Sequence, residues 1–174
     1  NKALVIDGVV PTVTGVTSSK TNGTYGVGEV IAIQVTFSEA VAVTGTAQIT
    51  LETGTTDRTI NYASGSGTST LTFNYTVQAG DVSTDLDYVA TNSLVLNGGT
   101  IKDAAANDAI LTLASPGDPN SLGANKALVI DGVAPTVTSV DVPTNGTYIA
   151  GDDLEFTVNF DEKVNVVTTG GTPQ

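Results

Sequence analysis

The chain has 174 residues with no Cys, His, Met or Trp, and 18 acidic against 6 basic side chains give it a formal net charge of −12. These absences exclude disulfides, thiolate chemistry and the commonest general base and transition-metal ligand, and the lack of Met indicates a piece of a longer protein. So negative a surface repels nucleic acid and anionic lipid and attracts cations, while Thr and Val, abundant in this chain, favour pleated sheets.

The first predicted strand covers residues 12–17, and the second is marked by strict alternation. Ile31, Ile33, Val35 and Phe37 face one way on it. Asn22-Gly23 signals the turn between these two strands. The sequence therefore predicts an antiparallel start to the fold.

The later strands follow at short intervals. Ile49 and Leu51 mark a third and residues 59–62 a fourth, and the alternation of residues 71–77 marks a strong fifth. Weaker strands are expected near residues 94–101, 110–113 and 127–130. No segment shows helical periodicity and no apolar run of 18 residues occurs, so we expect essentially no helix and no membrane insertion. Seven or more short strands within one repeat predict an all-β, Ig-like antiparallel β-sandwich.

An internal repeat dominates the chain. Residues 1–13 (NKALVIDGVVPTV) return at residues 125–137, where only Val10 and Ala134 differ, and the register is 124 residues. Three shorter phrases return in the same order: TNGTY at 21–25 and 144–148, VTFSEAV at 35–41 as VNFDEKV at 158–164, and GTAQ at 45–48 as GTPQ at 171–174. A period this long suits a whole domain rather than a solenoid turn, so the sequence predicts a tandem array.

The repeat sets the expected domain boundaries. Residues 1–8 are expected to hold the end of a preceding repeat and a linker, residues 9–131 one complete sandwich, and residues 132–174 the first strands of the next repeat. Pro11 and Pro135 leave no flexible Gly/Ser linker and hold the chain extended at each joint. Consecutive repeats should therefore stand nearly end to end.

Acidic residues form three candidate metal-binding groups. The first is Glu39 and Glu162, which continue the core-facing rows of their strands and need a partner there. The second is Asp81, Asp85 and Asp87, and the third is Asp103 with Asn107 and Asp108. Calcium takes 6–8 oxygen ligands in loose geometry and would relieve the repulsion. Plainer readings stay open: a strand-end Glu bonded to loop amides, a solvated acidic loop and a polar turn.

Strand direction in an Ig sandwich indicates where these groups lie. Glu39 should lie at the N-terminal pole near Asp7, and Glu162 near Asp131. The fifth strand ends at the opposite pole, which would bring Asp81, Asp85 and Asp87 toward Asp131 as well. Strand direction alone does not decide at which pole of the sandwich Asp103 lies.

The phrases APTV, NGTY, VTFSEAV, the AGD loop and IKDAAAND together resemble the bacterial Ig-like repeats of giant surface adhesins, of the RTX and biofilm-associated types. The resemblance covers essentially the whole chain and implies long extracellular rods with calcium at domain junctions. It carries over to Asp7, Asp131, Glu39 and Glu162 and, less directly, to residues 81–87. One departure is Ala106-Asn107, where the family frequently has Gly-Asn.

We therefore expect a non-enzymatic structural extender on a bacterial cell surface. Its partners would be neighbouring repeats and, through domains outside this sequence, other cells or surfaces. A subunit of an extracellular filament and a carbohydrate- or cell-surface-binding module are the alternatives. Few aromatic side chains argue against the binding module. A hydrolase with paired carboxylates lacks any accompanying catalytic constellation.

Overall fold

The computed structural model describes residues 6–167 and 169 and divides into two compact units, Asn1–Val133 and Ala134–Gln174. Residues 1–5 of the first NKALVIDGV segment and the GTPQ phrase at 171–174 lie outside the described residues. The division falls two residues beyond the expected end of the complete repeat at Asp131. Each unit is described by itself.

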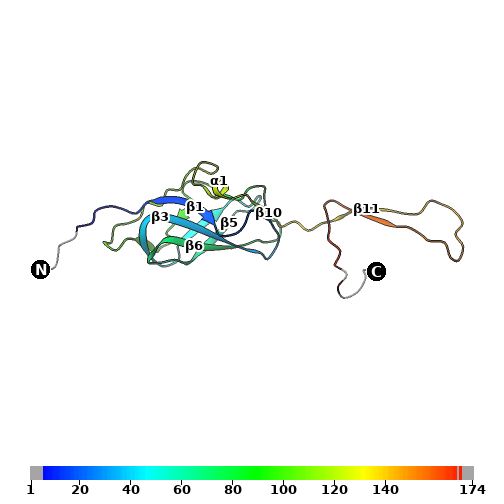
Figure 1. Ribbon diagram of the computed structural model, residues 1–174, viewed down its shortest axis with the longest axis horizontal. Helices are drawn as coiled ribbons and strands as arrows, with labels where there is room; N and C mark the ends of the chain where they lie inside the picture. Colours follow the sequence, from blue (N-terminus) through cyan, green and yellow to red (C-terminus); the bar gives the residue numbers. More distant parts are fainter. Residues whose placement is uncertain (1–5, 168, 170–174) are drawn as a thin grey trace. The chain divides into compact units, whose positions relative to one another are not determined.

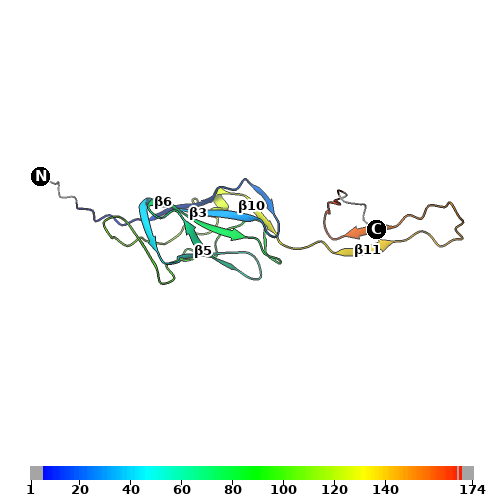
Figure 2. The same ribbon diagram turned by 90° about the horizontal axis from the view of Figure 1, so that it is seen from below.

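The first unit is built on one antiparallel sheet that curls around the core (Figures 1 and 2). Its strands follow the order β1-β3-β6-β5-β4-β8, with β9 pairing with β3 off this path. Their bounds are β1 (Val13–Ser18), β3 (Val30–Thr44), β4 (Gln48–Leu51), β5 (Arg58–Ser64), β6 (Thr68–Thr76), β8 (Leu94–Val95) and β9 (Thr100–Lys102). The protein is thus mostly β, as predicted, with a curled sheet as its main feature.

The long strand β3 causes much of the curl because it changes partners along its length. Its first half pairs with β1 and β6, and its second half, Ala42 to Thr44, pairs with β9. The register with β6 shifts between Thr36 and Val41. Such irregularities bend a strand and increase its twist, which lets one strand serve two regions of the sheet.

A smaller, three-stranded sheet lies at the end of the unit where the chain leaves it. β10 (Leu128–Asp131) forms its centre, parallel to β2 (Gly23–Tyr25) and antiparallel to β7 (Val82–Ser83). β2 and β7 are not predicted by the sequence, because strands of two or three residues are too short to show alternation.

Because successive side chains of a strand point to opposite faces, every second side chain lies on the inner face of the curled sheet. Ile31, Ile33 and Val35 on β3 are fully buried, as are Leu71, Phe73 and Tyr75 on β6. The predicted inward faces of these two strands are therefore confirmed. The Phe73 ring also meets Tyr62 edge to face, with centroids 6.1 Å apart.

One short helix of four residues occurs in a unit that otherwise contains essentially no helix, as expected. α1 (Leu122–Asn125) lies against β1, and its N-cap Ser121 accepts a hydrogen bond from Ala124 N (Figure 1). A single turn is too short for helical periodicity to show. Val16 N donates to the carbonyl of Asn120 and Asn125 Nδ2 donates to the carbonyl of Val16, so this segment covers the edge of β1. Covered edges resist unwanted strand pairing.

Most predicted strands are confirmed, but the one near residues 110–113 is wrong. There the chain makes only an isolated bridge between Ile110 and Thr12. The segment still contributes to the core, because Leu113 is buried and Leu111 is partly buried. Alternating apolar residues in this segment therefore reflect packing without a ladder of backbone hydrogen bonds.

The second unit contains a two-stranded antiparallel sheet of β11 (Val137–Asp141) and β12 (Thr157–Phe160). Val137 pairs with Phe160 and Val140 with Val158, and the register shifts between Val137 and Ser139. In the first unit the repeat-equivalent residues do the same: Val13 pairs with Phe37, Val16 pairs with Val35, and the register shifts between Val13 and Gly15. The repeat in sequence is therefore a repeat in strand register, irregularity included.

Candidate metal centre

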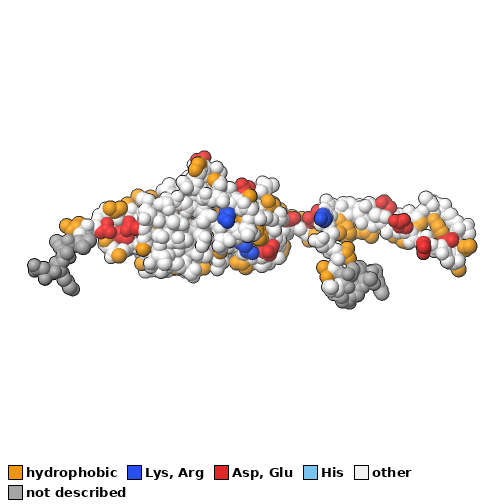
Figure 3. Space-filling model, viewed as in Figure 1, with side chains coloured by type: hydrophobic (Ala, Val, Ile, Leu, Met, Phe, Trp, Pro, Cys, Tyr) orange, Lys and Arg blue, Asp and Glu red, His pale blue; other side chains and the backbone are white. Residues whose placement is uncertain are grey.

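Three acidic side chains meet at the end of the first unit where the N-terminal segment enters (Figure 3). Asp7 lies in that segment, Glu39 lies on β3, and Asp103 follows directly after β9. One carboxylate oxygen from each lies within 4.8 Å of the others. We call Asp7, Glu39 and Asp103 the acidic triad. Among the described residues it is the one group of three acidic side chains this close.

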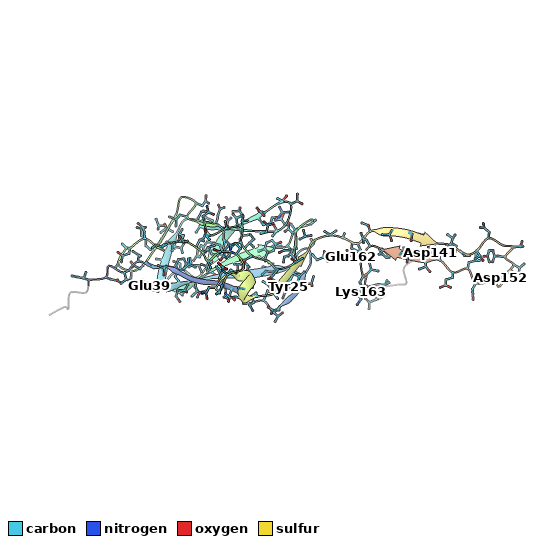
Figure 4. All side chains as sticks on the ribbon, turned by 90° about the horizontal axis from the view of Figure 1, so that it is seen from above. Tyr25, Glu39, Asp141, Asp152, Glu162 and Lys163 are labelled. Atoms are coloured by element: carbon cyan, nitrogen blue, oxygen red, sulfur yellow. The ribbon has the colours of Figure 1, made fainter. Side chains whose placement is uncertain are left out.

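Strand geometry explains why Glu39 points toward this cluster. It continues the inward row between Phe37 and Val41, both buried, and is itself half-buried at the end of the unit (Figure 4). Pairing of β9 with the second half of β3 then brings Asp103 alongside. The structure thus places Asp7 beside Glu39, as predicted, and settles the side on which Asp103 falls.

The side chain of Asn107 ties the N-terminal segment to the loop after β9. Its Nδ2 donates to Asp103 Oδ2 at 2.7 Å and approaches the carbonyl oxygens of Asp7 and Val9, both at 3.2 Å. Its backbone N–H donates to Asp103 Oδ1 at 2.8 Å. Asp7 also forms an Asx turn, in which Oδ1 accepts from Val9 N. Asn107 therefore links the Asp7 segment to Asp103 within the triad.

The triad carries negative charge without a cationic side chain in contact. The three ion pairs of the described residues join Lys20 to Glu29, Arg58 to Asp81 and Lys102 to Asp108. Partial desolvation, followed by repulsion from Asp103 and Asp7, raises the pKa of Glu39. For Asp103, desolvation is outweighed by hydrogen bonds from Asn107 and neighbouring backbone, which lower its pKa.

This donor set fits calcium. Carboxylate and carbonyl oxygens are the ligands that Ca²⁺ takes, and its loose coordination of 6–8 oxygens leaves room for water beside three carboxylates. The uncompensated charge of the triad is the observation that supports the fit. A cation there would remove the repulsion from Asp103 and Asp7, which adds to desolvation in raising the pKa of Glu39.

Asp81 lies elsewhere and is bonded within the first unit. Its Oδ1 accepts from Arg58, with the closest nitrogen at 2.7 Å, and its Oδ2 accepts from Tyr75 Oη at 2.7 Å and Gln78 N at 2.9 Å. Desolvation opposes these bonds, but they prevail and lower its pKa. The same site raises the pKa of Tyr75, mainly through burial. A calcium ion at Asp81 would have to displace Arg58.

Asp85 and Asp87 approach the short helix from the same loop. Asp87 is buried and accepts hydrogen bonds from Tyr88 N, Gly117 N and Leu122 N, so it holds the helix-bearing segment in position. Asp85 is exposed. The carboxylates of both lie within 3.5 Å of where a Cβ on Gly123 would stand. Asp87 acts here as an acceptor for backbone amides.

Asp131 ends β10 and forms the same Asx turn as Asp7, with Oδ1 accepting from Val133 N at 3.3 Å. The next residue, Gly132, is buried and clasped by the 80–81 loop: its N–H donates to Asp81 O and its carbonyl accepts from Gly80 N. The loop of Asp81 therefore reaches Asp131 through backbone. In the second unit, Glu162 is exposed just after β12, at the opposite end of the hairpin from Asp152 (Figure 4).

No family model, curated protein or solved structure matches this chain. In the described part of the chain, no helix is long and apolar enough to cross a membrane. The functional proposal therefore depends on the repeat and on the geometry of the acidic triad.

Proposed function

We propose that this chain is a structural extender of a large bacterial cell-surface adhesin, a non-enzymatic array of Ig-like repeats stiffened by calcium. The observation that carries the proposal is the shared strand register of β1 with β3 and of β11 with β12. Repetition of one structural unit, joint included, is what a spacer requires. If each copy bound a different ligand, we would instead expect the binding residues to differ between the copies.

Calcium would act on the joint that precedes each repeat. Asp7 belongs to the entering segment, whereas Glu39 and Asp103 belong to the body of the first unit. An ion held by all three ties the segment to the body and removes one source of bending. By the repeat register, Asp131 and Glu162 occupy the positions equivalent to Asp7 and Glu39. Each joint of the array would therefore carry the same device.

The calcium affinity expected of such a site fits an extracellular location. Extracellular calcium modules bind with dissociation constants of roughly 10⁻⁴–10⁻³ M. Such sites fill in the millimolar calcium outside cells and stay empty in cytosol. The partners of the chain are then its neighbouring repeats, while domains outside this sequence contact other cells or surfaces. The resemblance to adhesin repeats supports the same placement.

The first prediction concerns Glu39→Gln, measured by thermal melting of the chain with calcium and with chelator. Calcium should raise the melting temperature of the native chain, because an ion that binds only the folded form adds about 2.7 kcal/mol at a hundredfold excess over its Kd. Glu39→Gln should abolish most of this gain. In chelator, the same variant should melt higher than the native chain near neutral pH.

The last expectation follows from the sign of the pKa shift. The folded state raises the pKa of Glu39, so its stability falls as pH rises through that pKa, and Gln removes this loss. Glu52→Gln is the matched control, since Glu52 is an exposed acid outside the triad. A calcium response equal in both variants would contradict the site. Small-angle scattering of consecutive repeats should also give a larger maximum dimension with calcium.

A further inference from the structure

The backbone of Gly132 is enclosed where the chain leaves the first unit. Its N–H donates to Asp81 O at 2.7 Å, and its carbonyl accepts from Gly80 N at 2.9 Å. A Cβ on Gly132 would overlap Gln78 O and stand 2.8 Å from Asp81 O, so no other residue fits unless this backbone moves. We call the turn of residues 78–81 and its two hydrogen bonds to Gly132 the clasp.

A buried carboxylate fastens the clasp to the main sheet. The side chain of Asp81 is 1% exposed. Its Oδ1 accepts from Arg58 Nε at 2.8 Å and Nη2 at 2.7 Å, and its Oδ2 accepts from Tyr75 Oη at 2.7 Å. Arg58 lies on β5 and Tyr75 is on β6, which pairs with β5 in the sheet. The turn therefore cannot leave Gly132 together with its side chain unless charge-assisted hydrogen bonds break, and these are among the stronger ones in proteins.

The exit strand β10 has only short partners besides the clasp. It pairs over three residues with β2 and over two with β7, whereas β3 and β6 pair over eight. The bonds of Gly132 are the last before Val133, which is 52% exposed. The chain enters the first unit at one end and leaves from β10 at the other (Figures 1 and 2). A pull on the chain beyond Val133 therefore reaches the clasp first and β10 next.

We propose that the clasp is a tension-bearing lock, which keeps β10 in the first unit when the chain is pulled from its C-terminal side, and that the Asp81 carboxylate keeps the lock closed. β7 begins directly after Asp81, so an open clasp loosens β10 and one of its two partners together. The use of such a lock rests on the proposed extender function, because a spacer under load passes tension through each exit strand. The bonds of the clasp themselves need no calcium.

Constant-force unfolding of the full 174-residue chain, held by its two termini in chelator, tests the lock. Tyr75→Phe removes one hydrogen bond to Asp81 and should raise the unfolding rate of the first unit by about fivefold. Tyr88→Phe is the matched control, because Tyr88 is also buried and its Oη donates one bond of the same length, 2.7 Å, to Ala114 O outside the clasp. Both variants should lose similar stability in denaturant, but only Tyr75→Phe should unfold faster under force. An equal increase in both rates would overturn the proposal.

The point of attachment separates a lock from a general loss of stability. The chain has no Cys and Asn92 is exposed, so Asn92→Cys provides a single thiol as an alternative handle. Tension between the N-terminus and residue 92 does not pull on Gly132. With this handle, Tyr75→Phe should unfold no faster than Tyr88→Phe. If Tyr75→Phe accelerates unfolding equally at both attachment points, the clasp is ordinary packing and the proposal is wrong.

Removal of the charge gives a larger effect. Asp81→Asn should raise the unfolding rate between the termini by more than about tenfold, because it removes the charge-assisted bonds to Arg58. Asp57→Asn makes the same change of charge at an exposed residue next to Arg58 and should leave the rate unchanged. Tyr75→Phe decides the outcome if Asp81→Asn fails to fold. Because these rates are measured in chelator, their failure is distinct from a missing calcium response at the joint.

Discussion

At the scale of single residues, Ala106 has the least favourable backbone conformation for its type. It adopts φ +70° in the turn after β9, a region that L residues other than Asn and Asp rarely visit. The turn reverses tightly at this point, which lets Asn107 reach Asp103. Ala therefore keeps the turn at a cost in stability.

Ala106→Gly should stabilise the first unit by about 1 kcal/mol, because Gly carries no Cβ penalty at positive φ. Denaturant unfolding followed by circular dichroism would measure the change in midpoint at constant slope. Ala104→Gly is the control: Ala104 is exposed in the same loop and is not at positive φ. It should be neutral or destabilising. Destabilisation by Ala106→Gly would show that the turn tolerates Ala without strain.

The sequence could predict some of the acidic contacts and not others. Strand parity and direction are local properties, so they were sufficient to predict Asp7 beside Glu39. The inward turn of Asp81 depends on Arg58, 23 positions earlier on β5, and on the Tyr75 hydroxyl. Repulsion among Asp81, Asp85 and Asp87 therefore favours calcium from the sequence alone, whereas the fold supplies a guanidinium to Asp81 and backbone amides to Asp87.

At the scale of elements, the short strand β12 repeats the pairing register of part of β3, but its apolar side chains are exposed where those of β3 are buried. Alternation on β3 and β6 was strong enough to predict both strands and their inward faces, which the structure confirms. Strand partners were beyond the sequence, because pairing of β3 with β9 and of β10 with β2 joins distant segments. The two-residue strands and the one-turn helix carry too few residues for any period to show.

Burial predicts opposite outcomes for two equivalent truncations. Ile33→Ala should destabilise the first unit by about 2–5 kcal/mol, since Ile33 is fully buried and its loss leaves a cavity. Phe156→Ala, at the equivalent position, should leave the melting of the first unit unchanged because Phe156 is exposed. Thermal melting by circular dichroism compares the two. A similar loss in both variants would mean that the stability of the first unit depends on Phe156, against its exposure.

At the scale of the whole molecule, charge and repetition act together. The chain carries 18 acidic side chains, yet its apolar core forms a single cluster and its outward strand positions are largely Thr, Asn and Gln. Carboxylates are placed mainly in loops and at joints, where repetition multiplies them. If the proposed array exists, its units would gain solubility from this charge, and each joint would respond to cations.

The hydrogen bonds that the 80–81 loop makes to Gly132 affect how fast the Asp131-Gly132 bond rearranges to isoaspartate. Asp-Gly bonds rearrange when the Gly nitrogen attacks the Asp side-chain carboxyl, loses water to form a succinimide, and reopens by hydrolysis as isoaspartate. In Asp131-Gly132 that nitrogen is buried and bonded to Asp81 O at 2.7 Å, whereas Gly8 is exposed with nothing within 4 Å of where its Cβ would stand. The two copies of one dipeptide should therefore age at different rates.

Peptide mapping after prolonged incubation at neutral pH should find isoaspartate at Asp7 well before Asp131. Equal amounts at both sites would mean that the clasp opens freely. The rearrangement lengthens the backbone by one methylene and shifts the carboxylate of Asp7 away from Glu39 and Asp103. Chains with isoaspartate at position 7 should thus lose their response to calcium. Bound calcium should in turn slow the rearrangement, because it occupies the carboxylate that the Gly8 nitrogen must attack.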